Sequence, residues 1–389
     1  MRLSINQKIL EKILSHANWI IEKKQTVPIL GYVLFEAVKD KGLIITATNM
    51  DMTIVDNAVC EVTENGKYCL QANLIYDIIR KIKPGSNIDI YYSTDDNSVH
   101  IVSNNASFSI HYMESDGFPP IASAIYKVSF SMNTKLFKKS VDIAKVAMLQ
   151  DNSRFHLSGI HIHHENELGI NKIRFVATDL FRIACISTNA PTEVQNMEPI
   201  IVAKRTVLEI LKLADGSNIK DIKISISENR IAFSLKSDED KIQTEFSSRL
   251  INGNFPEYKA ALDVSNDKVL IVNTADFIES LERVSTIVTD ATSSIKLKIS
   301  QNNLTITGIS RELGSAVDEI EASFNGLRPM EICFNSRYLS EILRQIETPQ
   351  VQLLLAESNS STIIRPTNST EKSGIEMIFA VMPIEIVAT

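Results

Sequence analysis

The sequence DIIRKI at Asp77–Ile82 returns in altered form as EILKLA at Glu209–Ala214 and as EILRQI at Glu341–Ile346. Each copy places an acidic residue, two apolar residues and a basic residue in the same order. Successive copies begin 132 positions apart in both steps, from Asp77 to Glu209 and from Glu209 to Glu341. Equal spacing over such lengths indicates that the chain of 389 residues contains three copies of one structural unit.

The pattern around each copy is that of an amphipathic helix preceded by a short apolar strand. A second set of segments changes from strand-like alternation to helical spacing at an asparagine, and the three asparagines are Asn6, Asn133 and Asn273. Asparagine is a favoured N-cap because its side-chain oxygen accepts from a free backbone N–H of the first turn. We therefore expect two helices and several short strands in each unit, which is an α+β fold with mainly antiparallel sheet.

We expect three domains, with boundaries near residues 126 and 266. They span residues 1–126, 127–266 and 267–389. No segment rich in glycine, serine or proline separates them, so the units should form a continuous assembly without flexible linkers.

The charge of the chain is unevenly distributed. The whole chain carries a formal net charge of −7, whereas the six expected helical windows together carry +6, which leaves −13 for the strands and loops. If equivalent helices face the same way, one surface is positive and suits a polyanion such as duplex DNA, bound through its phosphates without reading the bases. The alternative is that these lysines only solvate amphipathic helices.

The sequence offers no catalytic apparatus. It has no phosphate-binding loop, no dinucleotide-binding glycine motif and no nucleophile elbow, so we expect no catalytic residue and no cofactor. No apolar run is long enough to cross a membrane, and the amino-terminal stretch does not resemble a signal peptide. Four cysteines without a CxxC pair favour a reducing cytoplasm.

One cluster supports a different class of function. The segment HIHHE at His161–Glu165 places His161 and His163 on one face of a strand, where two imidazoles could bind a metal ion. The second hypothesis is therefore a metal-dependent enzyme that uses His161, His163 and His164. The competing interpretation is a polar strand end that runs into a turn. A repeat scaffold that binds only proteins is the third hypothesis.

The chain resembles the bacterial DNA polymerase III beta subunit, the sliding clamp, over essentially its whole length. The segments that carry the resemblance are TVPILGYVLFEA at Thr26, LSGIHIHHE at Leu157, VATDLFRIAC at Val176, FPEY at Phe255 and VMPI at Val381. The resemblance implies three clamp domains, each with two helices packed on antiparallel sheets, in a head-to-tail dimeric ring with the helices inside. Such a ring encircles duplex DNA and tethers the replicative polymerase for processive synthesis, without catalysis.

The resemblance also implies partners and site residues. The partners are duplex DNA, DNA polymerase III subunits, an ATP-dependent clamp loader, other proteins with a clamp-binding motif and a second copy of the chain. The pocket for partner peptides maps onto Leu157, Thr178, Leu180, Phe181, Arg182, Ile183, Pro256, Ser361, Met382, Pro383 and Ile384, with Arg182 at the rim. The DNA contacts map onto Lys24, Arg80, Gln150, Phe155, Lys204 and Arg205. The dimer interface maps onto Phe108, Ile287 and Val288.

The sequence departs from the family pattern at the pocket. Leu180 and Phe181 stand where many relatives have Gly-His, and Ala260 and Ala261 stand where a basic and an apolar residue are common. Glu385 replaces a frequent arginine, and the chain continues through Thr389. These changes keep an apolar pocket and weaken its positive rim, so we expect a peptide preference of its own.

Overall fold

The computed structural model describes residues 1–22, 26–121, 124–151, 154–195, 197–215, 219–288, 293–357, 360–367 and 374–384. The chain divides into two compact units. Unit 1 comprises Met1–Lys138 with Arg205–Leu250, and unit 2 comprises Lys139–Lys204 with Ile251–Thr389. The middle repeat therefore contributes strands to both units, while the domain boundaries near residues 126 and 266 stay a prediction.

Unit 1 contains a five-stranded sheet in the order β5-β1-β7-β8-β9 and a nine-stranded sheet in the order β10-β6-β2-β3-β4-β18-β17-β16-β11. All neighbouring strands are antiparallel. The strands are β1 (Arg2–Asn6), β2 (Tyr32–Val38), β3 (Gly42–Thr48), β4 (Met52–Ala58), β5 (Glu61–Glu64), β6 (Gly66–Gln71), β7 (Asn87–Ser93), β8 (Ser98–Ser103), β9 (Ala106–Ile110), β10 (Tyr112–Glu114), β11 (Val128–Asn133), β16 (Asp221–Ile226), β17 (Arg230–Ser237) and β18 (Ile242–Arg249).

Unit 2 contains a twelve-stranded antiparallel sheet in the order β15-β12-β13-β14-β26-β25-β24-β19-β22-β21-β20-β23. The strands are β12 (Gly159–Glu167), β13 (Ile170–Thr178), β14 (Arg182–Asn189), β15 (Ile200–Ala203), β19 (Lys268–Asn273), β20 (Ser294–Ser300), β21 (Asn303–Ser310), β22 (Gly314–Phe324), β23 (Met330–Asn335), β24 (Gln350–Leu355), β25 (Thr362–Pro366) and β26 (Ile375–Val381).

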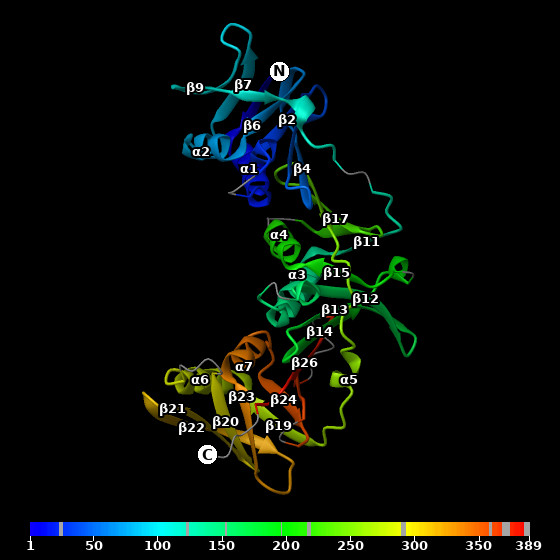
Figure 1. Ribbon diagram of the computed structural model, residues 1–389, viewed down its shortest axis with the longest axis vertical. Coiled ribbons are helices and arrows are strands. Elements are labelled where there is room, and N and C mark those ends of the chain that lie inside the picture. The colour runs from blue at the N-terminus through cyan, green and yellow to red at the C-terminus, as the bar shows by residue number, and fades with distance from the viewer. Residues whose placement is uncertain are drawn as a thin grey trace. The chain divides into compact units, whose positions relative to one another are not determined.

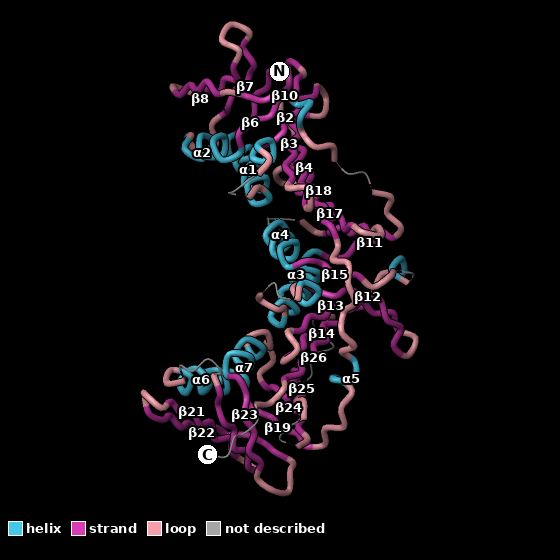
Figure 2. Tube along the Cα trace, viewed as in Figure 1, coloured by secondary structure: helices cyan, strands magenta, loops and turns pink. Residues whose placement is uncertain are grey.

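The helices of each unit cover one face of its sheets. In unit 1, α1 and α2 lie side by side, and α1 packs on β3 and β4 (Figures 1 and 2). In unit 2, α6 and α7 lie side by side, and α6 packs on β21 and β22. The helices are α1 (Gln7–Ile20), α2 (Ala72–Lys81), α3 (Thr134–Ala144), α4 (Lys204–Ala214), α5 (Lys259–Leu262), α6 (Thr274–Ser285) and α7 (Ser336–Leu343). Two principal helices per repeat on antiparallel sheets confirm the predicted α+β fold.

The recurring motif lies in α2, α4 and α7 and has the same orientation in each. Its two apolar residues are buried in every copy, and its basic residue is exposed in every copy; the apolar pairs are Ile78 and Ile79, Ile210 and Leu211, and Ile342 and Leu343. The predicted N-caps are also confirmed, because the side chains of Asn6, Asn133 and Asn273 accept from backbone N–H groups of the following turn. The repeat in the sequence is therefore a repeat of local structure.

Candidate functional site

The turn between β13 and β14 exposes two apolar side chains. Thr178 Oγ1 donates to the carbonyl of Arg182 at 2.8 Å, and Asp179 Oδ1 accepts from the backbone N–H of Phe181 at 3.1 Å. Leu180 takes a positive φ of 76°, a conformation that is costly for a residue other than glycine. These bonds hold the turn so that Leu180 is 46% exposed and Phe181 is 61% exposed.

The end of the last strand lies beside this turn. Strand β26 pairs with β14 in a register that sets Val381 opposite Arg182, and the next residue, Met382, donates its backbone N–H to the carbonyl of Phe181 at 2.8 Å. Ile384 donates to the carbonyl of Cys333 at 2.8 Å. Met382 is exposed, whereas Pro383 and Ile384 are half-buried. We call the exposed side chains of Leu180, Phe181 and Met382 the apolar patch.

The other predicted pocket residues lie near this patch or beneath the surface. Strand β25 sets Thr362 opposite Val381, which brings the neighbouring Ser361 to the same end of the sheet. Ile183 packs on the cluster formed by Val176, Cys185 and Tyr258. Leu157 and Thr178 are buried, and Pro256 is half-buried. The structure therefore brings Phe181 and Met382 into direct backbone contact, and it places Leu157 and Thr178 in the interior.

Arg182 does not stand at a rim as the resemblance implies. Its side chain is only 5% exposed, and its Nε and Nη1 atoms lie 3.0 Å from Asp179 and 2.6 Å from Glu341. The guanidinium also lies over the ring of Tyr338, 4.2 Å from its centroid. Partial burial of Tyr338 raises the pKa of its hydroxyl. Arg182 is therefore a buried, paired cation that ties β14 to α7, and it offers little free charge to a ligand.

The histidine cluster is part of the packing around α5. His163 Nε2 lies 2.8 Å from the hydroxyl of Tyr258, and the ring of His161 stacks on Phe255 with centroids 4.6 Å apart. His164 Nε2 lies 3.0 Å from Asn171 Oδ1. Burial lowers the pKa of His161 to about 4 and also lowers the pKa of His163. His163 and His164 thus have hydrogen-bond partners and His161 packs against an aromatic ring, although its Nδ1 atom has no hydrogen-bond partner. These separate contacts favour the interpretation as structure over a metal site.

Among the described residues, no group of three or more histidine, cysteine, aspartate or glutamate side chains could hold a metal ion. The metal-dependent enzyme is therefore not supported by the geometry. Within the same part of the chain, no helix is long and apolar enough to cross a membrane.

Basic side chains predicted to contact DNA are mostly engaged within the protein. Arg205 pairs with Glu22 and donates to the carbonyl of Ile20 at 3.0 Å. Lys204 Nζ donates to Gln150 Oε1 at 2.7 Å, and Arg80 pairs with Asp77 at 3.0 Å. The net charge of +6 for the helical windows already includes Glu22 and Asp77, so these pairs show where the positive charge is neutralised and do not change its sum.

The remaining predicted DNA contacts are a surface aromatic and a lysine. Phe155 is 59% exposed and meets the ring of His156 edge to face, at a centroid distance of 5.8 Å. Lys24 lies outside the described residues.

The three predicted interface residues differ in exposure. Phe108 is half-buried on β9, which is the edge strand of the five-stranded sheet. Ile287 follows α6 and is half-buried, whereas Val288 is buried within its own chain. Val288 can approach β21 because Gly308 has no side chain there; a Cβ on Gly308 would lie 2.5 Å from Val288 Cγ2. A charged residue at position 288 would therefore disturb the fold as well as any interface.

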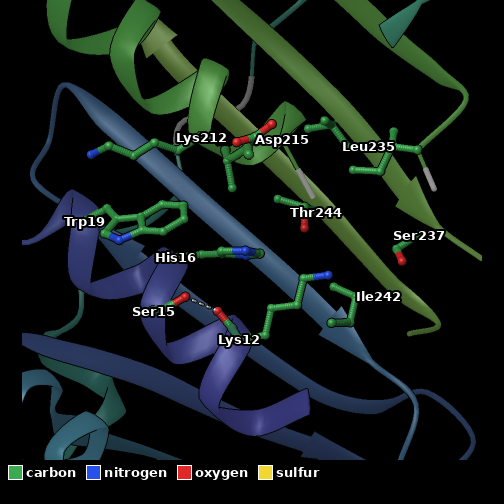
Figure 3. A pocket seen from close by; sticks show the side chains of 12 residues that line it. Lys12, Ser15, His16, Trp19, Lys212, Asp215, Leu235, Ser237, Ile242 and Thr244 are labelled. Carbon is green, nitrogen blue, oxygen red and sulfur yellow. Dashed lines mark hydrogen bonds between the residues drawn. The ribbon is translucent and has the colours of Figure 1, made fainter. Parts of the chain in front are cut away.

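Unit 1 also contains a cavity of about 270 Å³ between α1, α4 and strands β17 and β18 (Figure 3). Trp19 forms one wall, and Lys212 Nζ lies over its ring, 5.3 Å from the centroid. Each lysine that lines the cavity pairs with a carboxylate, Lys12 with Asp240 and Lys212 with Glu209, and the ring of His16 lies 3.2 Å from Asp56. The cavity therefore presents no unpaired positive group to a ligand, and it belongs to the packing of the first two repeats.

Three family models match the chain in sequence. They are the N-terminal domain of the DNA polymerase III beta subunit at residues 1–122, the central domain at 131–257 and the C-terminal domain at 259–379. The beta sliding clamp of Caulobacter vibrioides is 29% identical over 364 residues, which cover 94% of this chain and 95% of that protein. The beta sliding clamp of Rickettsia felis is 26% identical and covers 99% of this chain and 100% of that protein.

Solved structures agree with these matches. The sliding clamp of Bartonella birtlesii bound to griselimycin has a TM-score of 0.91 and 31% identity, and covers 99% of this chain and 100% of that chain. The sliding clamp of Caulobacter crescentus has a TM-score of 0.89 and 28% identity, with the same coverage. The chain therefore belongs to the DNA polymerase III beta subunit family, the beta sliding clamps.

Proposed function

We propose that this protein is a DNA sliding clamp. Two copies close head to tail into a ring around duplex DNA, and the ring tethers the replicative DNA polymerase without catalysing a reaction. The observation that carries the proposal is the succession of three matched domains, which leaves almost no part of the chain unassigned. Tethering raises the effective concentration of the polymerase at its template, so it rebinds before it diffuses away. The bacterial cytoplasm, where the chromosome is replicated, is the expected location.

The strand order of the sheets supports the ring. Within unit 1, the last strand of the middle repeat, β18, pairs with β4 and sets Phe246 opposite Ile54. Within unit 2, the last strand of the third repeat, β26, pairs with β14 and sets Phe379 opposite Ala184. Each junction thus joins the last strand of one repeat to a strand of the repeat before it.

In the first repeat, the strand that corresponds to β18 and β26 is β9, and it lacks such a neighbour in the described chain. Strand β9 ends the five-stranded sheet and pairs only with β8 in the described chain. Its Phe108 stands where the other repeats have Phe246 and Phe379, which are both fully buried. In the third repeat, β22 corresponds to β4 and β14. We infer that β9 of one copy pairs with β22 of a second copy, and two such contacts close a ring.

The end of α6 belongs to the same inferred contact. Ile287, which follows α6, occupies the position in the third repeat that Ile20, the last residue of α1, occupies in the first. Helix α1 packs on β4, where the first two repeats join. Phe108 and Ile287 are therefore the interface residues that we favour, with Val288 supporting them from within the chain.

The helices supply the DNA contacts in this proposal. Arg80 and Arg205 are surface cations whose ion pairs with Asp77 and Glu22 are weak in water, since exposed pairs contribute roughly 0–1 kcal/mol, and Lys204 donates to the uncharged Gln150. Phosphates can replace these partners, which gives weak contacts that depend on salt and ignore sequence. Such contacts suit a ring that must slide, and Gln150 and Phe155 would add uncharged contacts to the backbone.

The apolar patch is the proposed docking site for partners. Short apolar peptides of DNA polymerase III subunits, of the ATP-dependent clamp loader and of other proteins with a clamp-binding motif would bind there. Met382 is unbranched and flexible, so it can adapt to different side chains. The residues implied by the resemblance around the patch would line the same site.

Retention on plasmid DNA tests the proposal. The protein is loaded on nicked circular plasmid by its cognate ATP-dependent loader, washed in high salt, and the plasmid is then linearised. We expect the protein to survive the salt wash and to leave the DNA after linearisation, because a closed ring is held by topology. Loss in salt before linearisation, from a loader proven active on another clamp, would contradict the ring.

A further inference from the structure

Strands β4, β14 and β22 hold equivalent places in the three repeats, and the residues at their starts differ in exposure. The strands begin at Met52, Arg182 and Gly314. Met52 is 3% exposed and Arg182 is 5% exposed, so the chain covers both of these starts. Gly314 has no side chain, and Leu313 before it is 58% exposed. Of these three starts, that of β22 is therefore the uncovered one.

A helix of the following repeat lies at each of the two covered starts. The residue that it uses stands three positions before the acidic residue of the recurring motif, and it is Thr206 in α4 and Tyr338 in α7. Thr206 Oγ1 lies 2.6 Å from Ser248 Oγ, and β18 sets Ser248 opposite Met52. In unit 2, the guanidinium of Arg182 lies over the ring of Tyr338, 4.2 Å from its centroid. The repeat thus uses one helical position to meet the strand start of the repeat before it.

The same helical position in the first repeat is a leucine. Leu74 in α2 stands three positions before Asp77, and it is 42% exposed. Asp77 pairs with Arg80 of its own helix. Its counterpart in the third repeat, Glu341, pairs instead with Arg182 of the second repeat. The first repeat therefore presents an apolar side chain and an already paired carboxylate where the third repeat presents an aromatic ring and a carboxylate that binds across the junction.

We propose that Leu74 of one copy packs on Leu313 of a second copy, so that an apolar contact closes the ring. This inference rests on the proposed ring, because pairing of β9 with β22 brings α2 of one copy to the start of β22 of the other. A second copy is the occupant that the repeat specifies, since both junctions within the chain place a helix of one repeat at the strand start of the repeat before it. Single exposed leucines are common. These two are exposed at the positions that the internal junctions bring together.

The chemistry of this contact differs from that of its counterpart in unit 2. There the strand start is a cation, Arg182, which pairs with Glu341 of α7. Salt screens the attraction between charges, whereas it leaves contact between apolar side chains intact or strengthens it. We therefore expect the contribution of Leu74 and Leu313 to ring closure to persist in high salt.

A double-mutant cycle tests the contact. The Kd of the dimer is measured by sedimentation velocity across a dilution series for Leu74→Ala, for Leu313→Ala and for the protein with both changes. Leu327→Ala is the matched control, because Leu327 is a fully exposed leucine of the same repeat as Leu313. Circular dichroism checks that each variant is folded.

We expect each single change to raise the Kd of the dimer at least about tenfold, since a ring loses two contacts. Both changes together should raise it little further, because they remove the same contact. Leu327→Ala should leave Kd unchanged. The ratio of mutant to unaltered Kd should be the same in low and in high salt, and a ratio that falls to one in high salt would overturn the apolar nature of the contact.

A disulfide tests the same contact by distance. Two cysteines can be joined only where their Cα atoms lie within roughly 7 Å. A chain with Leu74→Cys and Leu313→Cys should form a covalent dimer on oxidation with diamide, as seen in a denaturing gel without reductant. A chain with Leu74→Cys and Leu327→Cys should run as a monomer in the same gel.

These measurements separate the contact from the ring. Effects of Leu74→Ala and Leu313→Ala that are absent or additive, or a missing covalent dimer, would overturn the contact, and an unaltered protein that is still a dimer would leave the ring standing. An unaltered protein that sediments as a monomer at micromolar concentration would overturn the ring and the contact together.

Discussion

Replacing Phe108 by aspartate should separate the ring into folded monomers. Phe108 is half-buried on the edge strand β9, whereas its counterparts Phe246 and Phe379 are fully buried at the two junctions within the chain. Association of two copies should bury Phe108 in the same way. In Phe108→Asp, that step would bury an unpaired carboxylate, at a cost of about 3 kcal/mol or more. A ring has two such contacts, so the loss is about 6 kcal/mol, or roughly 10⁴-fold in the dimer dissociation constant.

Sedimentation velocity across a dilution series measures this change. The unaltered protein should sediment as a dimer at micromolar concentration, and Phe108→Asp should sediment as a monomer. Val59→Asp is the control, because Val59 is 62% exposed and lies away from β9. Circular dichroism should show that both variants retain the fold. A Phe108→Asp protein that keeps the dimer mass at nanomolar concentration would refute the assignment of β9 to the interface.

Three further predictions follow from the site. Arg182→Ala should lower the free energy of unfolding by about 3 kcal/mol in urea titrations, because it leaves Asp179 buried and unpaired. Glu341→Gln should lower it by less than about 1 kcal/mol, since Glu341 is exposed; equal losses would contradict the closed ion pair. The free energy of unfolding should fall as the pH drops from about 6.5 to about 4. In this range His161 takes up a proton in the unfolded chain, whereas in the folded protein its pKa is lowered to about 4 and it stays neutral. The loss should reach about 2–3 kcal/mol. In His161→Phe, which keeps the stacking on Phe255, the free energy of unfolding should depend less on pH in this range. An unchanged pH dependence would assign the effect to other groups. Arg205→Ala should reduce the slope of log K against log salt for DNA binding by about one, and an unchanged slope would remove Arg205 from the contacts.

The sequence predicted the parts of the fold that depend on local rules. An asparagine N-cap and a spacing of three to four residues act within a few turns of helix, so Asn6, Asn133 and Asn273 could be assigned without a structure. The repeat then extended each local assignment to three places. For the same reason, the order of strands and helices within a repeat followed from alternating patterns and turns.

Contacts between distant residues could not be predicted. Arg205 pairs with Glu22, and Arg182 pairs with Glu341, across long stretches of the chain. Counting charges in sequence windows gives a net charge but does not show which side chains pair. The family resemblance placed Arg182 at a rim, although its side chain is buried. The burial of Val288 could not be predicted either, because it depends on Gly308, which lies in a later strand of the chain.

The candidate site shows how strand register decides function. Met50 and Leu180 have the same backbone conformation in equivalent turns, and both turns meet the end of another strand: Arg249 of β18 donates its backbone N–H to the carbonyl of Asp51 at 3.0 Å, as Met382 does to the carbonyl of Phe181. Strand β26 sets Val381 opposite Arg182, and this pairing brings Met382 to the carbonyl of Phe181. A shift of one residue would turn the side chains of β26 to the opposite face. The proposed docking site therefore depends on the last strand of the third repeat, which extends the sheet of the second, and in our proposal the equivalent strand of the first repeat, β9, pairs with a second copy.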